Sequence, residues 1–223
     1  MADKLAVYNQ ALIHLEKPSL AALTDDIEAR YVLDGVWTGA VEEAFCSADW
    51  NAFKKSVELV ESVTGTAALG WTFVYDYPAD YLRTVTVSNR PDFTCVDFKD
   101  YADEDSFLHT NTQPLYLRYI SNSKIATVGS WPTMFWRYVA LKLAFDACGK
   151  LTSGTTLEQK IEAKLDKAFR LAKSVDARNE NNKRIATGSW ARSRRGGYDT
   201  GYSDGNSGGT LVGGEITPGE GDV

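Results

Sequence analysis

The chain has 223 residues, of which 43% are hydrophobic and 24% charged, a composition typical of a globular protein with one domain or one domain and an appendage. Its net charge of −6 argues against a nucleic-acid-binding surface that covers the whole protein, because such proteins are usually basic.

The sequence also indicates where the protein is made. No stretch approaches 18 uninterrupted apolar residues, so no membrane span is expected. Residues 1–5 lack the basic start and the apolar run of an export signal. Cys46, Cys95 and Cys148 lie far apart, which suits three unpaired thiols in a reducing compartment. We therefore expect synthesis in the cytoplasm.

Two helices are expected first. Apolar residues recur at helical spacing over residues 4–15, and Pro18 follows to stop that helix. A longer apolar stripe predicts a helix over residues 25–46. We expect Asp25 to cap its start, with Glu28 reaching back from three residues later.

The period of the pattern then changes from about 3.6 to 2, which predicts a β-region over residues 53–122. Alternating or β-branched runs mark the expected strands, at residues 56–60, 71–75, 83–88, 94–98, 105–110 and 115–121. Because the strands are consecutive, we expect an antiparallel meander of five or six strands.

A third helix is expected over residues 131–149. Ser130 is a suitable N-cap, Pro132 is tolerated in the first turn because its missing N–H would have no partner there, and Gly149 would end the helix.

The fourth helix is predicted over residues 155–178. Thr155 and Glu158 form a capping-box pattern, apolar residues follow at three- and four-residue steps, and lysines and acidic residues alternate along the solvated face. The fold class is therefore α+β, with N-terminal and C-terminal helices packed as a small bundle beside a central antiparallel β-meander. Residues 1–180 would form this domain.

Residues 181–223 form an extended glycine-rich C-terminal arm, since 11 of the 18 glycines fall between residues 188 and 223. Such a segment has too little apolar surface to fold alone. Five basic and no acidic residues lie between Lys183 and Arg195, whereas the stretch from Gly196 is acidic. We expect the arm to become ordered on another molecule. Arginine and aromatic residues dominate interface energetics, so its expected docking residues are Trp190, Arg192, Arg194, Arg195, Tyr198 and Tyr202. A solvated basic patch is the alternative.

No catalytic, cofactor-binding or metal-binding constellation is predicted. The common catalytic motifs are absent from the sequence. His14 is expected to be a partly buried or surface histidine, and His109 to follow a solvated acidic turn. The pair Asp76 and Asp80 flanks Pro78, which suggests a turn in which Asp80 caps a single helical turn.

Four tryptophans, Trp50, Trp71, Trp131 and Trp136, are expected to anchor the core where the helices meet the sheet. Because no catalytic motif or constellation is found, we do not expect an enzyme.

The order of several short segments resembles the tail tubular protein A-like family of head–tail adaptors from tailed bacteriophages. The segments are 49–53 (DWNAF), 71–83 (WTFVYDYPADYLR), 115–120 (LYLRYI), 131–135 (WPTMF) and 140–144 (ALKLA). The resemblance spans about residues 5–180 and leaves the arm outside it.

The resemblance implies a structural virion protein of the tail or neck. It implies a ring of about twelve copies between the portal protein and the tail nozzle, with C-terminal segments that reach the portal. DNA would pass through the lumen without sequence-specific binding, and the acidic balance of this chain suits a channel in which DNA slides.

Two other interpretations stay open. The protein could bind nucleic acid through residues 192–198, in the manner of Arg/Gly-rich segments. It could also be an enzyme of unrecognised type, if His109 or the pair Asp76 and Asp80 met distant groups.

Overall fold

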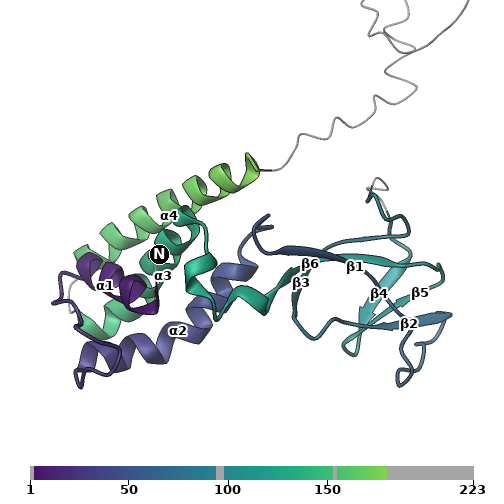
Figure 1. Ribbon diagram of the computed structural model, residues 1–223, viewed down its shortest axis with the longest axis horizontal. Helices are drawn as coiled ribbons and strands as arrows, with labels where there is room; N and C mark the ends of the chain where they lie inside the picture. The colour runs from purple at the N-terminus through teal and green to yellow at the C-terminus, as the bar shows by residue number, and fades with distance from the viewer. Residues whose placement is uncertain (1–2, 94–97, 153–154, 180–223) are drawn as a thin grey trace, which may run out of the picture. The chain divides into compact units, whose positions relative to one another are not determined.

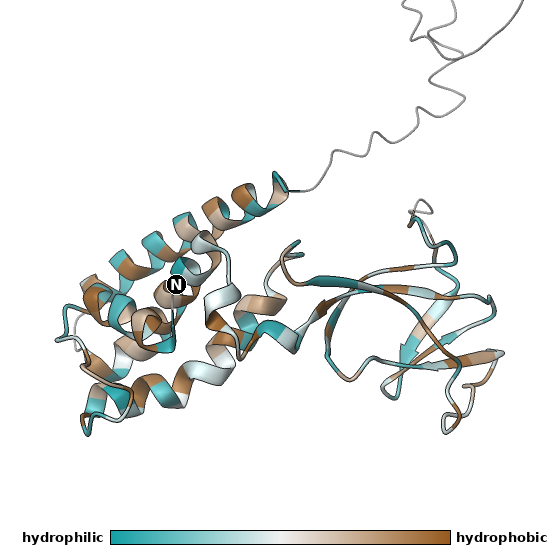
Figure 2. Ribbon diagram, viewed as in Figure 1, coloured by the Kyte–Doolittle hydropathy of each residue, from teal (hydrophilic) through white to brown (hydrophobic). Residues whose placement is uncertain are grey.

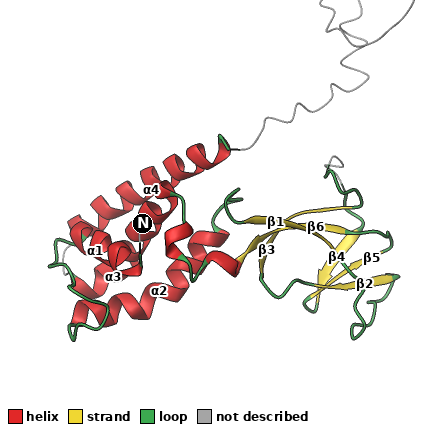
Figure 3. Cartoon of the chain, in the orientation of Figure 1, coloured by secondary structure: helices red, strands yellow, loops and turns green. Residues whose placement is uncertain are grey.

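A computed structural model describes residues 3–93, 98–152 and 155–179 (Figure 1). Within them are four α-helices: α1 (Lys4–His14), α2 (Glu28–Cys46), α3 (Thr133–Leu151) and α4 (Thr155–Ala177). Six strands lie between α2 and α3: β1 (Lys54–Glu58), β2 (Phe73–Asp76), β3 (Tyr81–Ser88), β4 (Tyr101–Glu104), β5 (Phe107–Thr110) and β6 (Tyr116–Ser121) (Figure 3). Two 3₁₀ turns, η1 (Asn122–Lys124) and η2 (Val128–Ser130), lead into α3. The predicted α+β class is confirmed.

The strands form two antiparallel three-stranded sheets, with the orders β1-β6-β3 and β2-β5-β4. This arrangement differs from a simple meander, because β6 lies between β1 and β3 instead of following β5. Four residues of β6 are buried, which suits a strand that is paired on both edges. The predicted strand at 94–98 falls almost entirely outside the described residues.

β4 and β5 form a hairpin that the sequence pattern did not predict correctly. Asp105 and Ser106 have positive φ angles of 50° and 65°, so they form the tight turn and β5 begins only at Phe107. The sequence pattern does not predict β4, because two of its four residues, Tyr-Ala-Asp-Glu, are acidic and three have low strand propensity.

The helix bodies match their predictions more closely than the caps do. The predicted cap of α2 is wrong: the helix begins at Glu28, after Ile27 and without a side-chain cap. The Asp25 carboxylate instead accepts hydrogen bonds from the backbone N–H groups of Ala21 and Ala22, at 2.7 and 3.1 Å. Asp25 therefore stabilises the preceding turn.

The ends of α3 also differ from prediction. Ser130 lies in η2, where its hydroxyl donates to the Thr127 carbonyl at 2.8 Å, and the helix begins at Thr133 after Pro132. The helix continues through Gly149, and Thr152 closes it by donating its N–H to the Cys148 carbonyl at 2.9 Å.

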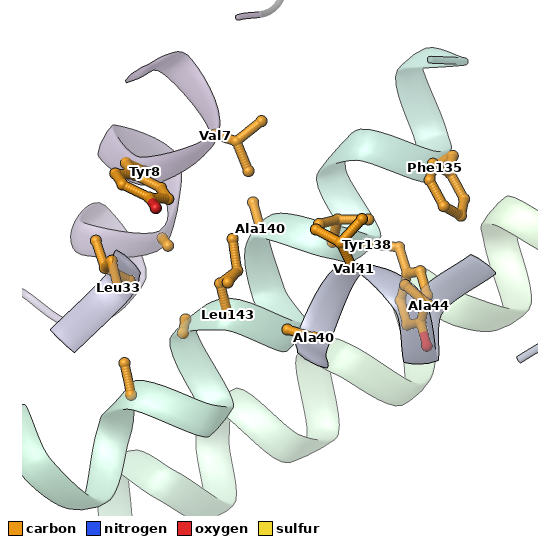
Figure 4. Close-up of a cluster of buried hydrophobic side chains, with 14 of the residues drawn as sticks. Val7, Tyr8, Leu33, Ala40, Val41, Ala44, Phe135, Tyr138, Ala140 and Leu143 are labelled. Carbon is orange, nitrogen blue, oxygen red and sulfur yellow. The ribbon is translucent and has the colours of Figure 1, made fainter. Parts of the chain in front are cut away.

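The core of the helical region is centred on α3, which contacts α1, α2 and α4. Because α3 has neighbours on several sides, its buried residues lie around most of its circumference, and they include Phe135, Val139 and Leu143. Side chains from α1 and α2 meet them in the cluster shown in Figure 4. A second cluster joins the two sheets, and its members are Leu59, Tyr75, Val87, Leu108, Leu115, Leu117 and Tyr119.

Three of the four tryptophans belong to the helical core, as predicted. Trp50 and Trp131 are buried and donate their indole N–H groups to the carbonyls of Ala44 and Lys124, both at 2.8 Å. Trp136 packs against the same cluster. Trp71 belongs to neither cluster, so its predicted role as a core anchor is wrong.

The last turn of α4 is tied to the connection between α2 and β1. The Asp176 carboxylate accepts the backbone N–H of Asn51 at 2.7 Å, and the Asn51 side-chain amide donates to the Asp176 carbonyl at 3.0 Å. These two hydrogen bonds anchor the C-terminal end of α4.

Candidate docking groove on the helical region

The predicted docking residues lie outside the described residues. They are Trp190, Arg192, Arg194, Arg195, Tyr198 and Tyr202, and their roles remain predictions. The strongest candidate site among the described residues is a hollow on the helical region.

This groove, as we call it, has a volume of about 220 Å³, and α1, α3 and α4 each contribute to it. It is lined by Gln10, His14, Met134, Arg137, Leu141, Ala168 and Leu171. Four of these side chains are apolar. Leu141 is buried, whereas Leu171 is 51% exposed, so apolar surface reaches the solvent at this point.

The positive charges at the groove come from Arg137, which lines it, and from Lys164, which acts on His14. Burial lowers the pKa of His14, and the nearby charges of Lys164 and Arg137 lower it further. The imidazole is therefore neutral at pH 7, and its Nε2 lies 3.3 Å from Gln10 Nε2, whose amide can donate to it. The prediction of a partly buried His14 is confirmed.

The cationic character continues along one flank of α4. Steps of three and four residues place side chains on one side of a helix, and such steps connect Lys160, Lys164, Lys167 and Leu171. The same steps connect Glu158, Glu162 and Asp166 on another flank. Arg170 lies one such step after Asp166, so the exposed side of α4 carries charges of both signs, whereas the flank from Lys160 to Lys167 carries cations alone (Figure 2 shows the hydropathy of α4).

The cations at the groove lack ion-pair partners. Within the part of the chain that the structure describes, neither Arg137 nor the α4 lysines on this flank form a salt bridge. Lys142, one helical turn farther along α3, shows the contrast: its Nζ lies 2.9 Å from Glu43 and 3.2 Å from Asp146. The groove thus combines apolar surface with unneutralised positive charge.

Asp80 is the centre of a second charged cluster, in the β-region. Its carboxylate accepts hydrogen bonds from Lys55 Nζ at 2.6 Å, Ser121 Oγ at 2.6 Å and Tyr119 OH at 2.8 Å. The bonds from Lys55 and Ser121 hold the pKa of Asp80 well below its usual range. Burial and the bond to Asp80 raise the pKa of Tyr119 to about 12.

These contacts make Asp80 a connector between strands. The predicted turn is present, since the Tyr81 N–H donates to the Pro78 carbonyl at 2.9 Å, but the capping role is wrong because Asp80 bonds to side chains of β1 and β6. The exposed side chain of Asp76 forms no hydrogen bond or ion pair with the other described residues. The two carboxylates therefore do not act on a common group.

His109 holds a loop in place. It is 2% exposed in β5, and its Nδ1 accepts the backbone N–H of Ala68 at 3.3 Å. The loop between β1 and β2 approaches closely enough that a Cβ on Gly65 would lie 3.0 Å from Val74. No group of three or more potential metal ligands gathers among the residues that the structure describes.

The same loop carries a second exposed surface. Val60, Val63 and Leu69 are 82%, 96% and 103% exposed, so three large apolar side chains project into solvent. Exposed apolar residues are common, and these three are candidate contacts for a partner because they lie within ten residues of one loop.

Among the described helices, none is both long and apolar enough to cross a bilayer. No protein-family model matches the sequence, and no curated protein matches it.

Proposed function

We propose that the chain is a structural head–tail adaptor of a tailed bacteriophage, located in the tail or neck of the virion. About twelve copies form a ring between the portal protein and the tail nozzle. DNA passes through the lumen without sequence-specific contacts. The protein has no catalytic role in this assembly.

One observation carries the proposal: four of the five segments on which the resemblance rests pack together in two pairs. Trp50 and Phe53 from residues 49–53 contact Phe135 from residues 131–135, with ring centroids 5.1 and 4.7 Å apart. Asp80 from residues 71–83 accepts the Tyr119 hydroxyl from residues 115–120. Segments that are distant in the sequence thus form common cores, which supports a resemblance of whole folds over one of isolated motifs.

Two surfaces suit the two neighbours in such a particle. The exposed apolar side chains of Val60, Val63 and Leu69 are available for the tail nozzle. The arm (residues 181–223) continues from the anchored end of α4 and is assigned to the portal through Trp190 and the arginines at 192, 194 and 195.

The test is the mass of the full-length protein mixed with its cognate portal ring. The proposal expects a stable complex of ring stoichiometry, which is weakened when residues 181–223 are deleted. Replacement of Trp190, Arg192, Arg194 and Arg195 by alanine in the full chain should weaken it similarly. Folded protein that does not associate with the portal at any ratio contradicts the proposal.

The cationic flank of α4 favours one alternative, a nucleic-acid-binding protein. Lys160, Lys164 and Lys167 could contact phosphates together with the arginines of residues 192–198. DNA affinity would then fall steeply with salt, and charge reversal on the flank would reduce the steepness of that dependence. DNA binding that is weak and insensitive to this charge reversal excludes the alternative.

A further inference from the structure

The groove between α1, α3 and α4 has features that the fold does not require. Met134, Leu141, Ala168 and Leu171 supply apolar surface, and Arg137 supplies a cation with no ion-pair partner among the described residues. Such a surface matches a polypeptide segment that carries both apolar side chains and carboxylates. A nucleic acid backbone would use the cations but leave the apolar side chains exposed.

The chain itself contains a segment of that composition. Residues 196–223 include five acidic residues and no basic ones, and they also include large apolar side chains: Tyr198, Tyr202, Leu211, Val212 and Ile216. This part of the arm is distinct from the basic part (residues 183–195) that we assign to the portal.

We propose that the groove binds the acidic segment, residues 196–223, of a second copy of the chain. Carboxylates of the segment pair with Arg137 and Lys164, and its apolar side chains cover Leu171 and Met134. The proposal rests on the proposed function, because in a closed ring each copy can give its segment to one neighbour and receive one from the other.

Electrostatics favour a second copy over the same chain. The first part of the arm is basic, with five cations and no acidic residue from Lys183 to Arg195. A chain that returned to its own groove would bring these cations back toward the basic flank of α4, where like charges repel. A neighbouring copy can present its acidic end alone.

The chain beyond α4 is long enough to reach the groove of a neighbouring copy. The sequence continues for 44 residues after Asn179, from 180 to 223. At roughly 3.3–3.6 Å per extended residue, this length spans up to about 150 Å. The cost of ordering the segment must be offset by burial, so each individual contact is weak and the closed ring gains from having many of them.

The test uses mixed-isotope cross-linking of the full-length protein without portal. Unlabelled and ¹⁵N-labelled protein are mixed, and a carbodiimide then joins carboxylates to lysines that lie against them. We expect peptides that join Lys167 of one isotope to residues 199–223 of the other. Sedimentation across a range of concentrations should show self-association that weakens with salt.

Charge reversal provides the matched variants. Arg137→Glu with Lys164→Glu should weaken self-association by at least about tenfold, which corresponds to about 1.4 kcal/mol. Lys99→Glu with Lys150→Glu makes the same change in net charge at exposed lysines outside the groove and should have no such effect. Adding Glu215→Lys and Glu220→Lys to the groove variant should restore much of the loss.

Three results overturn the inference. Cross-links between peptides of the same isotope only would place the segment of each chain on its own groove. A full-length protein that stays monomeric and gives no such cross-links excludes the contact, and this result is independent of whether the protein binds portal. Loss of DNA binding in the groove variant, with the cross-links unchanged, would assign the groove to nucleic acid.

Discussion

The Asp80 cluster and the groove are both charged, but among the described residues only the first has all of its partners. Asp80 has a cationic partner and two hydroxyl donors, drawn from β1 and β6. Arg137 and Lys164 have no carboxylate partner among the described residues. A charge with its partners in place stabilises the fold, whereas a charge beside exposed apolar surface and without a partner indicates a binding surface. The following predictions test that distinction.

The largest effect should come from Asp80→Ala. The change leaves the buried Tyr119 hydroxyl without its acceptor and removes the Lys55 and Ser121 bonds to the carboxylate, although the Ser121 hydroxyl can still donate to Ser123 Oγ at 2.9 Å. We therefore expect a loss of about 2–4 kcal/mol in the free energy of unfolding. Urea denaturation measures it. Asp76→Ala is the control, because that exposed side chain has no partner in the described part of the chain, and it should change stability by less than about 0.5 kcal/mol. If both variants lost the same free energy of unfolding, the stabilising role of the Asp80 cluster would be contradicted.

The second-largest effect should be the loss of the stabilisation by Asp80 at low pH. Because the pKa of Asp80 is lowered in the folded state, the unfolded chain binds the proton more tightly. The stabilisation is complete above about pH 5, decreases as the pH falls below the ordinary value of about 3.9, and is lost below the folded pKa.

Asp80→Asn isolates this contribution. At pH 7 the variant should have a lower free energy of unfolding than the wild type. The difference between the two free energies of unfolding should decrease as the pH falls. Burial raises the pKa of Asp146, so protonation of that group acts in the opposite direction, but it acts equally in both proteins. Denaturation curves from pH 3 to pH 7 measure the difference, and a constant gap would contradict the assignment.

Removal of the groove cations should leave stability almost unchanged. Arg137→Ala with Lys164→Ala removes no ion pair within the described chain, so the free energy of unfolding should change by less than about 0.5 kcal/mol. Self-association should nevertheless weaken. A large loss of stability would mean that these side chains serve the fold.

The smallest effect is on His14. The same double variant should raise the pKa of His14 toward its ordinary value, because the positive charges of Lys164 and Arg137 disappear while burial remains. An NMR titration of the imidazole measures the shift. Lys150→Ala serves as the control and should leave the titration where it is.

Local patterns predict the elements of this fold better than their partners. The helical periods place α1 and α4 within about one residue, because periodicity depends on near neighbours. The position of β6 between β1 and β3 depends on which distant strands pair, and the alternation of apolar residues within each strand does not determine that pairing. The Asp80 cluster is equally non-local, since Lys55 and Tyr119 lie 25 and 39 residues away.

The groove was partly accessible from sequence. Steps of three and four from Lys160 lead to Lys164 and Lys167, so the cationic flank of α4 can be found in the sequence. The contributions of His14 and Arg137 could not be predicted, because they depend on how α1 and α3 pack beside α4.

The anchored end of α4 has a mechanical consequence. A free helix end frays turn by turn when the chain beyond it is pulled, but here the Asp176 carboxylate and carbonyl are both bonded to Asn51. A pulling force applied beyond residue 179 would therefore be transmitted through these two hydrogen bonds to the segment that connects α2 and β1. The helix would keep its last turn, and the load would be shared between the helical region and the first strand of the sheet.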